Sequence, residues 1–173
     1  GPEVAVAMLG ILKSGAAFVP IDPTWPADRI QKALQQLNPK VVLTAGATRV
    51  NAECKLLSVS IDDRAAVGPS SEVGPQSPMY ACFTSGSTGE PKAAIIHHGG
   101  VINRFGWMNN QFCHARRPIA AQTTRHVFDS AVWQILWPLA SGGRTVLLME
   151  EDVLGAEALL AVIRREGVTI ADF

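Results

Sequence analysis

The stretch MYACFTSGSTGEPKAAIIH, residues 79–97, sets one polar turn between two apolar runs. Residues 79–83 and 93–97 each predict a strand, because short apolar runs bounded by turn-forming residues are typical of buried strands. The turn between them, TSGSTGEPK at residues 84–92, holds two glycines, four hydroxyl side chains and one lysine. Ligand sites in α/β proteins gather at the carboxyl ends of strands, so we expect a ligand where residues 79–83 end.

The composition of this turn suits phosphate groups. Glycines let the backbone present N–H groups as a concave nest, hydroxyls donate further hydrogen bonds, and a lysine adds a compact positive charge. The predicted phosphate-binding residues are Thr84, Ser85, Gly86, Ser87, Thr88, Gly89 and Lys92. A Walker-type loop is excluded, since Pro91 precedes Lys92 and Ala93 follows it where that loop needs Gly-Lys-Ser/Thr. The alternative is a Ser/Thr/Gly-rich surface hairpin that binds nothing.

Helical and strand patterns alternate outward from this turn in both directions. Apolar residues recur at helical spacing in segments 4–12, 28–37, from about 101, 130–140 and 157–166, and the first of these predicts a buried helix. Further strands are predicted at 17–21, 41–44, 56–61, 119–123, 145–149 and 169–173, and the Gly-, Pro- and Ser-rich segment 65–78 predicts a surface loop. Because parallel neighbours need helical crossovers, this alternation predicts a layered α/β fold with a largely parallel sheet and flanking helices.

Composition limits the kinds of partner and compartment. The 173 residues carry 15 basic and 15 acidic side chains, so no basic field exists to attract nucleic acid or an anionic membrane surface. The apolar stretch 4–12 stops at Lys13, far short of the ~20 residues that span a bilayer, and no secretion signal is recognisable. Cys54, Cys82 and Cys113 are odd in number and widely spaced. We therefore expect a cytoplasmic protein that binds neither nucleic acid nor membrane.

The histidines do not predict a metal site. Adjacent residues on a strand point to opposite faces, so His97 and His98, which close the strand after the turn, are not expected to share an ion. His114 and His126 have no acidic or cysteine ligand at useful spacing. We predict no metal bound by the chain's own side chains.

Two segments carry a resemblance to a known family. TSGSTGEPK at 84–92 resembles the phosphate-loop signature of the AMP-forming adenylating superfamily, which includes peptide synthetase adenylation domains, acyl-CoA synthetases and firefly-type luciferases. Ala93 stands where that superfamily usually has glycine. LKSGAAFVPIDP at 12–23 is similar to the LKAGGAYVPLDP segment typical of nonribosomal peptide synthetase adenylation domains. The chain is thus identified as resembling the front part of the large N-terminal domain of that fold.

A third segment bears on the substrate. FDSAVWQI at 128–135 resembles the FDxSVWE segment of the same family, with Ala131 in place of the usual serine. The resemblance implies that Asp129 pairs with a substrate α-ammonium, and a carboxylate at the mouth of an apolar helix is stabilised by such a cation. It also implies that Ser130 and Trp133 line the side-chain pocket and that Phe128 lies near the substrate carboxylate and nucleotide. The alternatives are a helix N-cap for Asp129 and core positions for the two aromatic residues.

The resemblance spans nearly the whole chain and implies an activity. It implies that residues 1–173 are a partial adenylation domain, cut at both ends, of a ligase that forms aminoacyl-AMP and pyrophosphate from an amino acid and ATP with Mg²⁺. The product would load the phosphopantetheine of a carrier domain, next to neighbouring synthetase domains, for secondary metabolite biosynthesis. The family's catalytic lysine falls beyond residue 173, so the chain by itself is expected to make little or no adenylate. The alternatives are an acyl-CoA or aryl-acid ligase and a noncatalytic α/β interaction domain.

Overall fold

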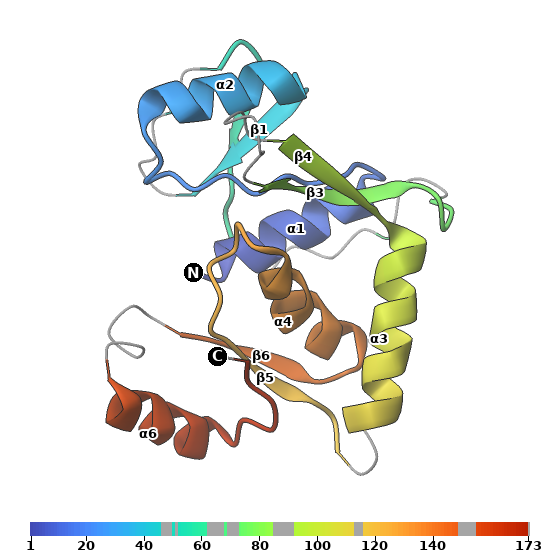
Figure 1. Ribbon diagram of the computed structural model, residues 1–173, viewed down its shortest axis with the longest axis vertical. Coiled ribbons are helices and arrows are strands. Elements are labelled where there is room, and N and C mark those ends of the chain that lie inside the picture. The colour runs from blue at the N-terminus through green and yellow to red at the C-terminus, as the bar shows by residue number, and fades with distance from the viewer. Residues whose placement is uncertain are drawn as a thin grey trace. The chain divides into compact units, whose positions relative to one another are not determined.

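The computed structural model describes residues 1–45, 50, 52–61, 68, 73–84, 92–112, 116–148 and 155–172. These residues divide into two compact units (Figure 1). The N-terminal unit comprises residues 2–73 and 78–95, and the C-terminal unit comprises residue 1, residues 74–77 and residues 96–173. No helix among the described residues is long and apolar enough to cross a bilayer.

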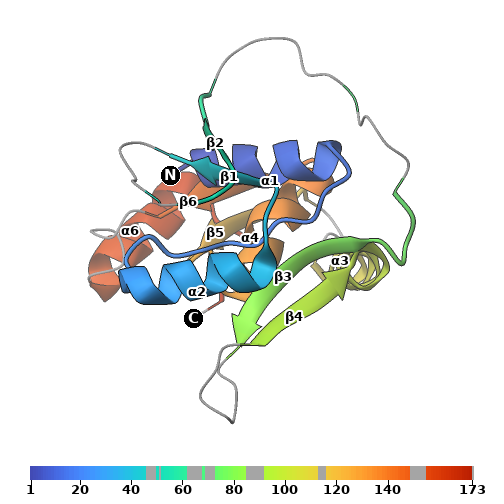
Figure 2. The same ribbon diagram turned by 90° about the horizontal axis from the view of Figure 1, so that it is seen from above.

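The N-terminal unit contains two helices and two pairs of strands. Its helices are α1 (Glu3–Lys13) and α2 (Ala27–Leu37), and its strands are β1 (Val41–Thr44), β2 (Lys55–Ser58), β3 (Pro78–Thr84) and most of β4 (Lys92–His97). β1 and β2 pair in parallel, with Val41 opposite Lys55. β3 pairs with β4, and Figure 2 shows these two strands running in opposite directions.

Local sequence explains where these helices end. The backbone N–H and the hydroxyl of Ser14 both donate to the Ile11 carbonyl, and Gly15 follows with a positive φ of 81° that suits glycine. α2 begins after Pro26 and ends at Asn38, which adopts the left-handed conformation with φ 43°. Pro39 then prevents the helix from continuing.

The core of the N-terminal unit lies around β3. Met79, Tyr80, Ala81 and Cys82 are buried in succession, so β3 is covered on both faces. Phe18 forms a parallel bridge with Tyr80, and their rings stack with centroids 5.5 Å apart. The strand that leads toward the predicted phosphate-binding turn is therefore held by burial along most of its length.

The C-terminal unit is a three-layer arrangement. It contains α3 (His98–Phe112), β5 (Ile119–Gln122), α4 (Asp129–Ala140), β6 (Arg144–Leu147) and α6 (Ala156–Glu166). β5 and β6 are parallel, with Ile119 opposite Arg144, and Ala120 makes a parallel bridge to Ile170 on the other side of β5. The chain therefore crosses from β5 to β6 through α4 and returns through α6. Two crossover connections of the same hand that run in opposite directions along a sheet must lie on opposite faces of it. Figure 1 shows α4 and α6 on opposite sides of the strand pair.

α4 is the central helix of this unit, and a proline interrupts its hydrogen bonds. Residues 131–138 of α4 are all buried. Pro138 has no N–H, so the Gln134 carbonyl four residues earlier lacks its usual helical donor. The Thr145 hydroxyl of β6 lies 3.1 Å from that carbonyl and 2.9 Å from the carbonyl of Ile135. The sheet thus supplies the donor that the proline removes.

The predicted α/β class with parallel pairing and flanking helices is confirmed, and four local predictions need correction. The predicted strands 17–21 and 169–173 contract to single bridges, because only Phe18 and Ile170 of the described residues in these segments pair with a strand, and residue 173 lies outside the described part. The helix predicted to be buried, α1, buries only Met8. β2 spans Lys55–Ser58 and not 56–61.

The helix predicted from about residue 101 begins earlier. α3 starts at His98, so His97 ends β4 and His98 opens a helix, and the expectation that both lie on one strand is wrong. The backbone N–H of His98 donates to the Ser77 carbonyl and that of Gly99 to the Pro75 carbonyl. These distant carbonyls satisfy N–H groups that the first turn of a helix leaves open, which the local sequence did not indicate.

Candidate functional site

The polar turn after β3 is fastened at its base. The Thr84 hydroxyl, at the end of β3, donates to the carbonyl oxygen of Lys92, at the start of β4, over 3.2 Å. The two predicted phosphate-binding residues that the structure describes are thus brought together, and both are exposed. The other five, Ser85, Gly86, Ser87, Thr88 and Gly89, lie outside the described residues.

The hydrogen bond between Thr84 and Lys92 defines the role of Thr84 in this structure. A hydroxyl has one proton to donate, and here that proton is directed at the Lys92 carbonyl. The Lys92 side chain lies on the surface, where its ammonium is available to an anion. Thr84 therefore holds the two strand ends together in this structure, while Lys92 presents the positive charge.

Aromatic contacts that the sequence did not reveal support the end of β3. The Phe83 ring meets the Trp25 ring edge to face, with centroids 6.2 Å apart. The Arg29 guanidinium lies over the Trp25 ring, 4.0 Å from its centroid. Trp25 and Arg29 are four residues apart across the start of α2, a spacing that places such side chains near one another. This stack braces the residue that immediately precedes Thr84.

Asp129 is the first residue of α4 and does not cap it. The N-cap is Phe128, whose backbone is extended, and no side chain donates to or accepts from the helix end as a cap. The carboxylate of Asp129 is exposed, and no described residue hydrogen-bonds to it or forms an ion pair with it. The N-cap alternative is therefore wrong. The position is still favourable to a negative charge, because the N-terminal end of a helix carries a partial positive charge.

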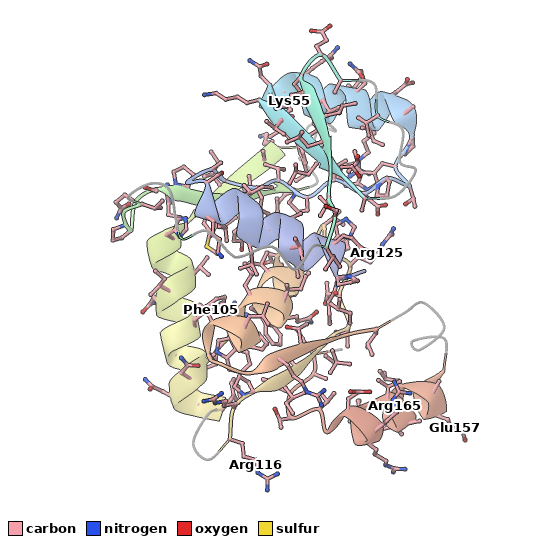
Figure 3. All side chains as sticks on the ribbon, turned by 180° about the vertical axis from the view of Figure 1, so that it is seen from behind. Lys55, Phe105, Arg116, Arg125, Glu157 and Arg165 are labelled. Atoms are coloured by element: carbon pink, nitrogen blue, oxygen red, sulfur yellow. The ribbon has the colours of Figure 1, made fainter. Side chains whose placement is uncertain are left out.

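The residues around Asp129 divide between surface and core. Phe128 is 57% exposed, so its alternative as a core residue is wrong, and Ser130 is half-buried. Trp133 is buried in a cluster with Met108 and Trp137. Figure 3 shows Phe105 on α3 directed toward α4, where it packs against this cluster. The structure thus groups Phe128, Asp129 and Ser130 at the start of α4 and places Trp133 in the core.

Gln134, a fully buried residue of α4, was not singled out by the sequence pattern. Its Oε1 accepts hydrogen bonds from the backbone N–H groups of Thr123 and Thr124 at 3.1 and 3.0 Å. Its Nε2 lies 3.1 Å from each of the two threonine hydroxyls. The signal available in the sequence was an amide within the apolar run AVWQILW, because a polar side chain on a buried helix must find partners.

The remaining titratable groups do not form a second centre in the described part of the chain. No cluster of three or more histidine, cysteine, aspartate or glutamate side chains occurs there that could hold a metal ion. The hydrogen bond from Arg165 lowers the pKa of the Glu166 carboxyl, with further help from the charges of Arg165 and Arg144. That pair lies on the surface at the end of α6, away from the start of α4 in the sequence.

Comparisons with known proteins agree with this description. Residues 1–172 match the family described as AMP-binding enzyme. A mycosubtilin synthase of Bacillus subtilis is 34% identical over 99% of the chain, which spans 7% of that protein. The nonribosomal peptide synthetase FmoA3, solved with AMPPNP and with alpha-methyl-L-serine-AMP, is 28% identical over 97% of the chain, with TM-scores of 0.84 and 0.83.

A more distant structure shares the fold. A malonyl-CoA ligase, in a ternary product complex with methylmalonyl-CoA and AMP, is 22% identical with a TM-score of 0.84 over 99% of the chain. The chain spans 18% of FmoA3 in its AMPPNP-bound form and 37% of that ligase. Fold, sequence match and relatives point the same way: the chain belongs to the AMP-binding enzyme family, where it resembles the adenylation modules of nonribosomal peptide synthetases.

Proposed function

We propose that the complete protein is an amino-acid adenylating ligase that joins an amino acid to the AMP part of ATP and releases pyrophosphate. The observation that carries this proposal is the open carboxylate of Asp129 at the start of a buried helix, with no partner among the described residues. An α-ammonium group would supply the missing charge, whereas a fatty or aryl acid would not. In support, FmoA3 was solved with an aminoacyl adenylate, alpha-methyl-L-serine-AMP.

The residues of the β3–β4 turn suit the phosphate side of this reaction. Lys92 presents an exposed ammonium, and the hydroxyls and glycines at 85–89 supply hydrogen-bond donors, so together they would neutralise charge that develops on the departing pyrophosphate, while Thr84 holds the two strand ends together. Magnesium that enters with ATP would screen the phosphate oxygens from one another.

The start of α4 suits the carboxylic substrate. We assign Asp129 to the α-ammonium, Phe128 to the neighbourhood of the substrate carboxylate and nucleotide, and Ser130 to the wall of the side-chain pocket. We also assign Trp133 to the wall of this pocket; because it packs in the core with Met108 and Trp137, a substitution there would act through packing as well as contact. The protein's part is to hold the reactants in line, since orientation alone can contribute several kcal/mol, up to roughly 10 kcal/mol, to catalysis.

The wider assignment follows the relatives. We propose that residues 1–173 are a partial adenylation domain, because they span 18% of FmoA3 and 7% of the mycosubtilin synthase. The complete protein would pass the aminoacyl group to the phosphopantetheine thiol of a carrier domain, among neighbouring synthetase domains, in the cytoplasm. The 173 residues alone would form little or no adenylate.

Amino-acid-dependent exchange of labelled pyrophosphate into ATP by the complete protein tests the proposal. We expect exchange with at least one amino acid, and Asp129→Ala should abolish most of it. The matched control is Asp28→Ala, which removes another exposed carboxylate from the first turn of a helix, α2, and should leave exchange intact. Undiminished exchange in Asp129→Ala, or equal exchange with carboxylic acids that lack an amine, would refute the amino-acid assignment.

A further inference from the structure

The connection from β5 to α4 is tied to α4 by one buried amide. Residues 123–128 are all the chain between Gln122, the end of β5, and Asp129, the start of α4. Gln134 reaches back from inside α4 to the first two of these residues and meets both of their backbone N–H groups and both of their hydroxyls, at 3.0 to 3.1 Å. The amide of a glutamine has two acceptor sites and two donors, so this set satisfies it completely.

The rest of the connection leaves little freedom between that tie and Asp129. The Phe128 N–H donates to the Arg125 carbonyl over 3.0 Å, which closes a turn over residues 125–128. The Ala131 N–H then donates to the Phe128 carbonyl. Once the start of the connection is fixed against α4, this turn determines where Phe128 and Asp129 lie relative to the end of β5.

Gln134 is itself held from a second side. Its backbone carbonyl, which Pro138 deprives of a helical donor, lies 3.1 Å from the Thr145 hydroxyl of β6. The side chain thus connects α4 to the chain that leaves β5, and the main chain of the same residue connects α4 to β6. Gln134 is fully buried and its amide is fully satisfied, so its side chain favours one arrangement of the Thr123–Thr124 backbone, whereas the bond to Thr145 joins α4 to β6 without reaching that connection.

We propose that Gln134 is a positioning residue for the amino-acid site, which aims Asp129 by fixing the Thr123–Thr124 backbone. This inference rests on the proposed function and goes beyond it, since the fully buried Gln134 would act through Thr123 and Thr124 and not by contact with the substrate. Its Oε1 is the essential atom, because that atom alone accepts from the two backbone N–H groups. A glutamate would keep this acceptor, whereas a methionine of similar length would remove it.

The experiment compares three variants of the complete protein in pyrophosphate exchange. We expect Gln134→Met to raise KM for the amino acid on the order of tenfold or more, because small misplacements of a binding group are costly, while KM for ATP changes by less than about twofold. Gln134→Glu should restore most of the loss. Thr145→Val, which removes a hydroxyl bonded to the Gln134 backbone without touching the connection, should lower Tm and leave both KM values near those of the unsubstituted protein.

Amide hydrogen exchange supplies a readout that does not depend on activity. Exchange at Thr123 and Thr124 should accelerate in Gln134→Met relative to Thr145→Val. If Gln134→Met does not fold, Gln134→Leu makes the same comparison, since it also removes the Oε1 acceptor of the two backbone N–H groups, and the KM for the amino acid should rise in the same direction.

The outcomes separate this inference from the proposed function. Equal amino-acid KM values in Gln134→Met and Thr145→Val, or a uniform loss for both substrates, would overturn the positioning role and leave the ligase assignment intact. An unsubstituted protein that exchanges pyrophosphate with no amino acid would instead overturn the proposed function, and with it the site that Gln134 is said to position.

Discussion

Replacing Thr145 tests whether the sheet compensates for the proline inside α4. Thr145→Val keeps the shape of the side chain and removes the hydroxyl that lies 3.1 Å from the Gln134 carbonyl and 2.9 Å from the Ile135 carbonyl. A lost hydrogen bond costs about 0.5–1.5 kcal/mol net, and a buried carbonyl left without a donor costs about 1–3 kcal/mol. Since Thr145 is only half-buried, we expect a loss of about 1–3 kcal/mol in the free energy of unfolding.

A second substitution makes the argument specific. Pro138→Ala restores the N–H that normally donates to the Gln134 carbonyl in a helix, so this carbonyl would depend less on the Thr145 hydroxyl. In that background Thr145→Val should cost about 1 kcal/mol less than in the original chain, a coupling well above the ~0.5 kcal/mol scatter of independent sites. Pro138→Ala also removes buried atoms, but the double-mutant cycle cancels that contribution.

The assay is urea unfolding followed by far-UV circular dichroism. Thr145→Ser is the control that keeps the hydroxyl and loses one methyl group, worth about 1 kcal/mol or less at a half-buried site. Additive effects of Thr145→Val and Pro138→Ala, within about 0.3 kcal/mol, would refute the compensation. Equal losses for Thr145→Val and Thr145→Ser would show that packing, and not the hydroxyl, stabilises the contact.

Three other perturbations follow from the same structure. Lys92→Ala should weaken AMPPNP binding by the complete protein about tenfold to hundredfold, because a hydrogen bond to a charged group contributes about 1.5–3 kcal/mol. Equilibrium titration measures this change. The control is Lys40→Ala, which removes another exposed lysine of the N-terminal unit and should leave AMPPNP binding unchanged. Trp137→Phe empties part of a fully buried site and removes the hydrogen bond from the indole N–H to Asn109, so urea unfolding should show a loss of about 2–3 kcal/mol in the free energy of unfolding. The control is Trp107→Phe, which changes a half-exposed side chain and should cost less than about 0.5 kcal/mol. The hydrogen bond from Arg165 holds the pKa of the Glu166 carboxyl below 4.5, so the ionised carboxylate stabilises the fold above that pH and this effect disappears as the pH falls through the lowered pKa. Urea unfolding at a series of pH values should therefore show that the free energies of unfolding of the original chain and Glu166→Gln converge on acidification. A difference between these two free energies that grew on acidification would contradict this sign.

The sequence predicted the elements whose formation depends on local pattern. α2 and α4 were expected at 28–37 and 130–140 and lie at Ala27–Leu37 and Asp129–Ala140, because apolar residues spaced by three and four identify a helix by themselves. The strands at 17–21 and 169–173 failed for the opposite reason. A strand exists through its partner, and each of these segments forms a single bridge, at Phe18 or Ile170, to a strand that lies far away in the sequence.

Burial at the site was harder to predict than residue type. Trp133 lies one turn from Asp129 along α4, yet it packs in the core with Met108 and Trp137. Spacing along a helix does not reveal which side chains face the core, so the sequence could not predict this burial. The partners of Gln134 are ten and eleven residues upstream and become its neighbours only when α4 folds back over β5. The sequence could show that this amide needed partners, but not which residues would supply them.

The contrast between Gln134 and Asp129 on one helix argues for function over stability. Gln134 is buried and has every hydrogen bond that its amide can form, as folding requires of a buried polar group. Asp129, at the exposed end of the same helix, lacks a partner among the described residues and is stabilised in the free protein by water and the helix end. A bound ligand that displaced this water would leave the carboxylate in need of a positive charge, so the cost of desolvation would select a substrate that carries an ammonium group. Specificity at this position would then arise when the substrate binds, with the carboxylate already aimed by the buried amide five residues along the helix.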